Sequence, residues 1–584
     1  MNRTIFFILF TLFTINIFGQ EEMLPIWMTS EEQKLIPAYK ESLTHKEITT
    51  LPVGSEIRTP GQWEEVQAVC ITWTGFPSIH RQLVSAIQQE CEVWIICFDS
   101  NAVKNDITAN GGSLNNTRYF QQSFNSIWMR DYGPNSVYLA GVDSLVFVDW
   151  IYNRPRPLDN AAPIGIGAQM NIPTYTTATA PNDLVHTGGN FMADGFGTGF
   201  SSNLVNDENA PGATYTVSGH TPLEVDQLMN SYQGIDNYIK MSNLPYDGIH
   251  HIDMHMKLLN EETLLIGEFP AGTSDGPQIE QNIQYIQNNF VSAFGTPYKI
   301  VRVPMPPSTG GAYAPNASYR TYTNNVIVNK SIIVPTYRTE YDTTALRIIQ
   351  EAMPGYNVVG IDVDNSGSNL ISQGGALHCI TKEVASSDPL LISHQNLPDT
   401  WETVNPYVVN ALIRHKSGIA SATLYYKTSL TGAYSSVPMT FISGNTFSAS
   451  IPGQPEGTRV YYYIQAQSNS GKQQVRPMPA PDGYFTFLVY QTADLPESSN
   501  MVDVNIYPNP SSESTFITTS STYSTLGKLE LIDASGRTVK MIFEGQIPTG
   551  TITFHLDASQ IETGMYFIRL RSDRKEFTQK LIIH

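Results

Sequence analysis

The pattern of apolar and polar positions divides the chain into regions of different character. Between about residues 55 and 386, short apolar runs that fit buried strands alternate with stretches of helical periodicity. Turns rich in Gly, Pro and Asn separate them, which is typical of an α/β domain. The expected strands are 67–73, 93–98, 144–150, 263–268, 325–328 and 332–335, and the expected helices are 78–89, 278–294 and 342–352, the last beginning at an Asp cap.

Helical periodicity disappears after residue 386. Residues 387–491 hold short alternating strands such as 422–426 and 459–466, and about 100 residues of this kind favour an immunoglobulin-like β-sandwich. A polar stretch, 492–501, predicts a linker, and 502–584 predicts a second all-β unit.

The N-terminus has the pattern of a signal peptide. One positive charge at Arg3 precedes an apolar run over 5–18, which is too short for a comfortable membrane span. We predict a signal peptide over 1–19 and a propeptide or N-terminal lead-in over 20–54. No other stretch approaches about 18 apolar residues, so the mature chain is expected to be soluble.

Composition narrows the range of partners. The 584 residues favour three to four domains, and 34 basic against 53 acidic residues give a net charge of −19. This acidic balance argues against nucleic acid and anionic membrane surfaces as main partners. Four cysteines in a chain of this size do not predict a disulfide framework.

One of these cysteines differs from the others. Cys70 and Cys97 lie in apolar strands, where a thiol acts as a small hydrophobe, and Cys91 precedes the second of those strands. Cys379 instead follows His378 in the turn over 374–379, where we expect an exposed thiolate. An ordinary, unreactive thiol is the alternative for this position.

A second group of reactive side chains lies at 249–255. In an extended segment, His251, Asp253 and His255 would share one face, whereas His250 would point away. Three interpretations compete: a zinc or iron site, a structural cluster whose members satisfy one another, and acid–base work by His251 beside Asp253. No second cluster of metal ligands stands out, so we predict no metal. We favour the third interpretation, because a separate Cys and a separate Asp are available and the groups together suit one substrate.

These groups together suit a guanidinium substrate. Two carboxylates, Asp131 and Asp253, can hold the planar cation through bidentate hydrogen bonds. Its carbon is a poor electrophile, so hydrolysis calls for a thiolate nucleophile, here Cys379. His251 can protonate the leaving nitrogen and then activate water.

The chain resembles the agmatine deiminase and bacterial peptidylarginine deiminase family in three segments. These are "WMRDYGP" (128–134), "HIDMH" (251–255) and "GGALHC" (374–379). The resemblance covers about 330 residues in the right chain order. It implies the five-bladed α/β propeller (pentein) fold and catalysis without a cofactor, while a structural calcium or sodium ion is left open. It also implies Trp128 as an apolar wall, Asn324 near the nucleophile with Asn325 as its neighbouring candidate, Asn190 and Asp194 bordering the substrate, and Tyr246 as a substrate contact.

The C-terminal unit resembles the sorting domain of type IX secretion cargo from Bacteroidota. The similarity rests on "YPNP" (507–510), "GMYFIRL" (564–570) and the terminal "QKLIIH". It implies handling by the type IX secretion machinery and a product that is secreted or attached to the outer-membrane surface. A further adhesive sandwich is the alternative.

The segment 152–157 bears on the identity of the guanidine. Its prolines hold Arg154 and Arg156 in extended backbone, and two preorganised arginines would bind a carboxylate well. The alternative is that both are structural arginines paired with Asp159 or a similar group. The segment also resembles the secreted peptidylarginine deiminase more than cytoplasmic agmatine deiminases.

The sequence therefore predicts a secreted peptidylarginine deiminase that converts arginine, preferably at the C-terminus of a peptide, to citrulline and ammonia. Its expected partners are arginine-containing peptides or proteins. Hydrolysis of agmatine or free arginine is the alternative within the same chemistry, and a non-catalytic surface adhesin is the alternative from another class.

Overall fold

The computed structural model describes residues 23–43, 56–491, 503–511, 514–521, 525–547, 550–559, 561–572 and 576–584. The predicted signal peptide (1–19) and the predicted linker (492–501) lie outside these ranges. So do residues 20–22 and 44–54 of the predicted lead-in. In the described residues, no helix is long and apolar enough to cross a membrane. The chain forms two compact units, of which the first comprises residues 1–398, 405–453 and 459–487, and the second comprises 399–404, 454–458 and 488–584.

The α/β region is built from one repeated arrangement of strands. A central strand pairs antiparallel with one neighbour and parallel with another, and helices connect the parallel pair, as a right-handed crossover requires. In the first such sheet, β2 (Val66–Thr72) lies between β20 (Thr381–Ala385) and β3 (Glu92–Cys97), and β4 (Thr117–Gln121) pairs with β3. The helices α3 (Pro77–Ile87) and α4 (Ser100–Ala109) make the connections.

Four more sheets of the described region follow this arrangement. Their strands are β1 (Ile57–Arg58), β5 (Asn135–Leu139), β6 (Ser144–Tyr152), β7 (Thr174–Thr177) and β8 (Val185–His186) in one sheet; β9 (Met192–Ala193), β10 (Thr198–Ser202) and β11 (Asn237–Met241) in the next; β12 (Met256–Leu258), β13 (Thr263–Glu268) and β14 (Lys299–Pro304) in the third; and β15 (Val326–Val328), β16 (Ser331–Thr336) and β17 (Asn357–Asp362) in the fourth.

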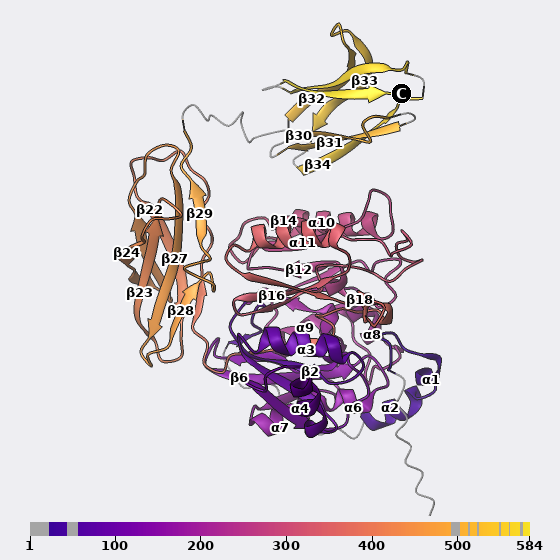
Figure 1. The fold of residues 1–584 in the computed structure, drawn as a ribbon, viewed down its shortest axis with the longest axis vertical. Helices are drawn as coiled ribbons and strands as arrows, with labels where there is room; N and C mark the ends of the chain where they lie inside the picture. The colour runs from indigo at the N-terminus through magenta and orange to yellow at the C-terminus, as the bar shows by residue number, and fades with distance from the viewer. Residues whose placement is uncertain are drawn as a thin grey trace, which may run out of the picture. The chain divides into compact units, whose positions relative to one another are not determined.

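Helices and short turns of helix connect these strands, and α11 packs beside β14 (Figure 1). Besides α3 and α4, the α-helices are α1 (Ser30–Gln33), α2 (Ile36–Leu43), α5 (Met129–Tyr132), α6 (Pro157–Asn160), α7 (Ala162–Met170), α8 (Leu204–Asn209), α9 (Pro222–Gln233), α10 (Gly276–Asn289) and α11 (Thr339–Ala352). The 3₁₀ turns are η1 (Gly188–Asn190), η2 (Ile252–Met254) and η3 (Ile371–Gln373), and β18 (Asp364–Asn365) pairs with β19 (Ser368–Asn369).

The last strand of the α/β region closes onto the first. β20 pairs with β2 although some 300 residues separate them, and both strands are almost entirely buried. The pairing places the Cys379 turn, which directly precedes β20, against the beginning of the domain. The core on this side contains Cys70 and Cys97, as the apolar strand pattern predicts.

Residues 391–488 form two antiparallel sheets, as the alternating pattern predicts. Their strands are drawn in orange in Figure 1. One sheet has the order β21 (Leu391–Ser393), β22 (Tyr407–Arg414), β26 (Thr446–Ile451) and β25 (Thr440–Ser443); the other has β24 (Ser435–Pro438), β23 (Ile419–Lys427), β27 (Arg459–Ser468) and β28 (Gln473–Arg476), with β29 (Phe485–Leu488) beside β27.

The C-terminal region is also all β. It contains a three-stranded sheet and a four-stranded sheet in its described residues, around a core that includes Leu529 and Ile568. The strands are β30 (Asp503–Tyr507), β31 (Ser514–Ser521) and β34 (Gly550–Asp557), and then β33 (Thr538–Ile547), β32 (Thr525–Asp533), β35 (Gly564–Ser572) and β36 (Glu576–Ile583).

The predicted N-cap of α11 is wrong. The helix begins at Thr339, three residues before Asp342, and its N-cap residue Arg338 makes no side-chain cap. Asp342 lies inside the first turn, where its Oδ1 accepts hydrogen bonds from the Tyr337 backbone N–H (2.9 Å) and the Tyr322 hydroxyl (2.8 Å). The carboxylate thus holds the residues that precede the helix and does not cap the helix N-terminus.

We expect D342A to lower the free energy of unfolding of the first compact unit by about 1–3 kcal/mol, because it leaves a backbone N–H and a buried hydroxyl without their acceptor. Urea denaturation followed by tryptophan fluorescence measures the change. The matched control is E340A in the same helical turn, whose side chain is 65% exposed and which should change little. Equal losses in the two variants would contradict the role of Asp342.

Candidate active site

Cys379 lies in the turn between η3 and β20, with its side chain fully buried. Asn324 Nδ2 donates to its Sγ (3.2 Å), and Asp253 Oδ2 lies 3.7 Å from the same sulfur. Burial holds the pKa of the Cys379 thiol well above its usual range, and ionisation of Asp253 raises it further. The predicted turn is therefore correct, but the expected exposure is wrong, and burial favours the thiol form in the free protein.

The 251–255 segment is not the extended strand that the sequence suggested. His251 has extended backbone, whereas Ile252–Met254 form the 3₁₀ turn η2, so the alternation of faces is lost. Asp253 points to Cys379 as described above, and His255 is buried without a hydrogen bond to its ring. Burial lowers the pKa of His255 to about 4, which keeps it neutral.

Two carboxyl groups border the thiol, from different parts of the chain. Asp131 comes from the short helix α5 and Asp253 from η2, and both are 1% exposed or less. Burial raises the pKa of Asp131 to about 6, and burial and the charge of Asp131 raise that of Asp253 to about 8. Neither Oδ1 atom has a hydrogen-bond partner, so both acceptors remain available to a ligand.

His251 is the third reactive group of the site. Its Nδ1 lies 3.6 Å from Asp131 Oδ1, too far for a hydrogen bond, and neither ring nitrogen has a partner. Burial, with the nearby charge of Arg154, holds its pKa well below the usual range, so the free imidazole is neutral. A neutral imidazole and a thiol can exchange one proton when a substrate changes the charge of the site.

Two glycines permit these close approaches. A Cβ atom on Gly189 would lie 2.4 Å from His251 Nδ1 and 3.1 Å from Asp131 Oδ1. A Cβ atom on Gly375 would lie 2.6 Å from the Trp128 ring and 2.9 Å from Cys379 Sγ. The contacts with Gly375 also place the buried Trp128 ring beside Cys379.

The N-terminal segment forms part of the surroundings of this site. Residues 23–43 pack on the α/β region, and Ile26 is completely buried. Trp128 Nε1 donates to the Leu24 carbonyl (2.9 Å), and the Ile26 N–H donates to the Gln373 carbonyl beside the Cys379 turn (3.0 Å). The same segment thus contacts both Trp128 and the loop that carries the nucleophile.

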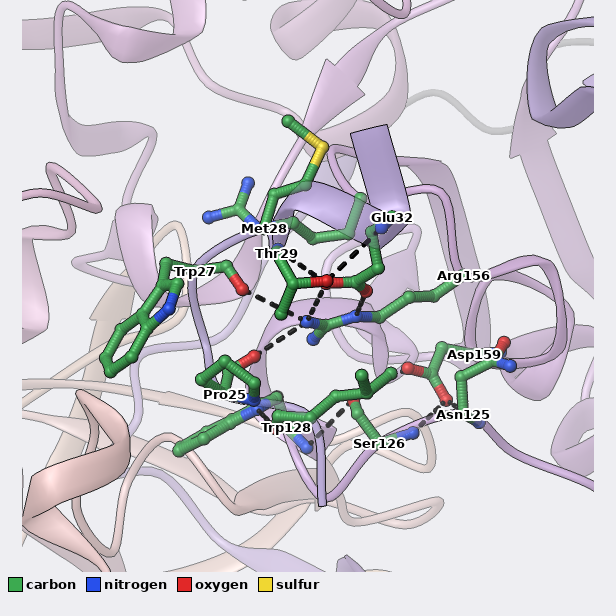
Figure 2. A network of polar contacts seen from close by, with 12 residues as sticks. Pro25, Trp27, Met28, Thr29, Glu32, Asn125, Ser126, Trp128, Arg156 and Asp159 are labelled. Atoms are coloured by element: carbon green, nitrogen blue, oxygen red, sulfur yellow. Dashed lines mark hydrogen bonds and ion pairs between the residues drawn. The ribbon is translucent and has the colours of Figure 1, made fainter. Parts of the chain in front are cut away.

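The two arginines of the 152–157 segment have different environments. Arg156 is buried and paired with Glu32 (Nε to Oε1, 2.6 Å), and it also donates to the carbonyls of Pro25 and Trp27 (Figure 2). The Arg154 guanidinium donates to two backbone carbonyls, those of Ile26 (3.0 Å) and Asn153 (2.7 Å). Arg154 is also partly exposed.

These contacts decide between the two interpretations for Arg156. Its partner is Glu32 of the N-terminal segment and not Asp159, whose carboxylate instead accepts hydrogen bonds from the backbone of Asn125 and Ser126 (Figure 2). Arg156 Nε and Nη2 are occupied by the Glu32 carboxylate and the two carbonyls, and Nη1 lies 3.5 Å from the Tyr152 hydroxyl. These contacts favour the structural interpretation for Arg156, and Arg154 is the stronger carboxylate-binding candidate.

The other predicted residues are placed as follows. Asn324, and not Asn325, contacts the nucleophile, because Asn325 Nδ2 donates to the Tyr322 carbonyl. Asn190 is buried, and its Nδ2 has no partner. Asp194 caps its own turn by accepting from the N–H groups of Phe196 and Thr198. The Tyr246 side chain is 48% exposed.

The sequence missed two features. The first is the N-terminal segment, since nothing local marks Glu32 as the partner of an arginine 124 residues away. The second is His378, whose Nδ1 lies 2.7 Å from Asp253 Oδ2. The position of His378 directly before Cys379 was the only signal in the sequence that it belongs to the site. Within the described residues, no group of three or more His, Cys, Asp and Glu side chains is arranged to hold a metal ion.

The Glu32–Arg156 pair gives a stability prediction. Burial alone would raise the pKa of Glu32, yet the hydrogen bond and charge of Arg156 hold it below the usual value, so the pair is ionised at neutral pH. We expect E32A to lower the free energy of unfolding by about 3–5 kcal/mol, because a buried guanidinium loses its counter-ion. Urea denaturation at pH 7 measures this change.

The control for this prediction is the adjacent E31A, which removes a carboxylate that is 81% exposed and paired only with Lys34. Such a pair contributes about 0–1 kcal/mol. The stabilisation by Glu32 should also decline as the pH falls through its lowered pKa. Similar unfolding midpoints for E32A and E31A would show that the buried pair does not hold the segment.

Comparisons with known proteins identify the family of two regions of the chain. A family model described as Porphyromonas-type peptidyl-arginine deiminase matches residues 58–384, which is more than half of the chain. A second, described as a secretion system C-terminal sorting domain, matches residues 505–584.

Individual relatives cover the same region. The agmatine deiminase of Pseudomonas syringae pv. tomato is 23% identical over 376 residues, which are 58% of this chain and 97% of that protein. A crystal structure from Porphyromonas gingivalis, of a protein assigned as an arginine deiminase, matches with a TM-score of 0.50 and 20% identity, over 57% of this chain and 99% of that one. The likeness to this structure shows the deiminase fold. The chain therefore belongs to the Porphyromonas-type peptidyl-arginine deiminase family and ends in a type IX secretion sorting domain.

Proposed function

We propose that the protein hydrolyses the guanidinium of peptide arginine to citrulline and ammonia through a covalent intermediate on Cys379. The observation that carries this proposal is the pair of buried carboxyl oxygens, Asp131 Oδ1 and Asp253 Oδ1, that lack partners beside a thiol and a free imidazole. Unpartnered acceptors in a buried site call for a ligand rich in donors, and a guanidinium has five N–H groups.

The cation would also change the protonation of its neighbours. Its positive charge favours ionisation of both carboxyl groups and of the Cys379 thiol, whose proton passes to His251. The sulfur attacks the guanidinium carbon, and His251 then protonates the nitrogen that leaves as ammonia. Water, deprotonated by His251, attacks the resulting amidino-thioether, and the C–S bond breaks to release the ureido group of citrulline.

Arg154 supports arginine over agmatine as the substrate. Its charge acts on Asp131 and His251, so it lies near the reacting groups. A guanidinium there attracts the α-carboxylate of a C-terminal arginine and repels the ammonium that ends agmatine. The curated relatives named agmatine deiminase favour the alternative, which is why the two substrates must be compared directly.

The proposal extends to architecture and export. We interpret the five sheets of the α/β region, closed by the β20–β2 pairing, as the blades of a propeller, and the sandwich over 387–491 as immunoglobulin-like. The sorting domain supports export by the type IX machinery, to a secreted or surface-attached location. Residues 20–54 keep the interpretation of a propeptide or lead-in.

One prediction from this proposal concerns the nucleophile. We expect C379A to lower the rate of citrulline formation on the order of 10⁶-fold, as removal of a covalent nucleophile does in other hydrolases. Mass spectrometry of arginine peptides reports each conversion as about +1 Da, from the exchange of an imine for a carbonyl group. The control is C97A, a buried strand cysteine outside the site. An adhesin would show no conversion even in the wild type.

The second prediction concerns substrate choice. The wild type should convert a peptide ending in arginine faster than its C-terminal amide and faster than agmatine. R154Q should lower kcat/KM for the free carboxylate about 10-fold or more, the loss of one charge-assisted hydrogen bond, and change that for the amide little. R347Q, an exposed arginine on α11, is the control. Equal turnover of the acid and the amide by the wild type would contradict a role for Arg154.

A further inference from the structure

His378 lies directly before the nucleophile in sequence, but its side chain points to Asp253. The two atoms His378 Nδ1 and Asp253 Oδ2 are 2.7 Å apart, and both side chains are fully buried. Asp253 Oδ2 is also the atom that faces Cys379 Sγ, whereas its Oδ1 has no partner. The histidine therefore contacts a carboxyl group that faces Cys379 through one oxygen and has its other oxygen free for the proposed substrate.

The far side of the imidazole fixes one of its protons. Its Nε2 lies 3.3 Å from the Gln62 side-chain oxygen, which also accepts from Lys257 Nζ (2.5 Å). Because an amide oxygen only accepts, Nε2 carries a hydrogen. Nδ1 then either accepts a hydrogen bond from a protonated Asp253 or donates one, as an imidazolium, to the ionised form. In both states one proton lies between the two residues.

The surroundings determine which state the free enzyme has. Three basic side chains act electrostatically on His378, as does His251: Arg130 from α5, Lys257 from β12 and Lys382 from β20. Burial lowers the pKa of Lys257 and of Lys382 to about 7. Glu383 lies 2.7 Å from Arg130 and offsets part of this charge. Burial and these basic side chains hold the pKa of His378 well below its usual range, so the proton resides on Asp253 when no substrate is bound.

We propose that His378 is a positioning residue that holds Asp253 and takes its proton when a guanidinium binds. This inference rests on the proposed deiminase function. The O–H bond of Asp253 breaks, an N–H bond forms at His378 Nδ1, and the carboxylate that results accepts from the substrate through both oxygens. The transfer needs no water, which suits a carboxyl group without exposed surface.

Calorimetry with the full chain tests this transfer. C379A, which binds without turnover, is titrated at pH 7 with a peptide ending in arginine, in buffers of different ionisation enthalpy. With His378 present, the proton stays in the site. In C379A/H378L, Asp253 must release it to the buffer, so this chain should release about one proton more for each bound peptide. Equal release by the two chains would overturn the proposal.

A second variant covers the case in which H378L does not fold. In H378N the amide keeps an N–H donor toward Asp253 but cannot accept a proton. The fixed donor favours the carboxylate, so the acid limb of the pH profile of kcat/KM should move to lower pH than in the wild type. H80N, which changes a buried histidine of α3 outside the site, should leave the limb in place. An unchanged limb in H378N, or an equal shift in H80N, would overturn the proposal.

The two hypotheses fail in different ways. A wild type that produces no citrulline from peptides, arginine or agmatine would refute the proposed function itself. A wild type that turns over substrate, with His378 variants that match it in proton release and pH profile, would refute only the role of His378.

Discussion

The desolvation of two carboxyl groups without a counter-ion is the constraint on which the rest of this site depends. Asp131 and Asp253 are buried, and in the ligand-free protein burial raises the pKa of both groups. Ionising them there is costly, and a cation between them removes most of that cost. The proposed guanidinium would supply this missing charge, and this difference would favour binding of one kind of ligand.

The scaffold keeps these groups in place through contacts that are fully satisfied. The Arg156–Glu32 pair, the Asn324 contacts with the Cys379 turn and the Asp159 contacts with the turn before Trp128 each complete the hydrogen bonding of their members. Within the site, Asp131 Oδ1, Asp253 Oδ1 and both ring nitrogens of His251 lack hydrogen-bond partners. Rigid support around unsatisfied groups is what preorganised catalysis requires.

The sequence predicted those features that depend on local pattern. The expected strands, the three expected helices and the turn of Cys379 follow from periodicity and turn residues. The site roles of Asp131, His251 and Asp253 follow from chemistry and stay predictions. The N-cap at Asp342, the exposed thiolate and the extended 251–255 segment were wrong, because in each case tertiary contacts overrode a local preference. The partners of Arg156 and His378 could not be predicted, since they lie 124 and 125 positions away in the chain.

The attachment of residues 23–43 to the Cys379 turn has a consequence for folding. The Ile26 N–H donates to the Gln373 carbonyl, and β2 pairs with β20. The two ends of a domain of more than 300 residues must therefore meet before Cys379 reaches its position in the site. Contacts of such long range form late, because the loop entropy is lost before they stabilise the chain. A nascent or partly unfolded polypeptide would thus lack a competent thiol, and reactivity would arise only in the completed domain.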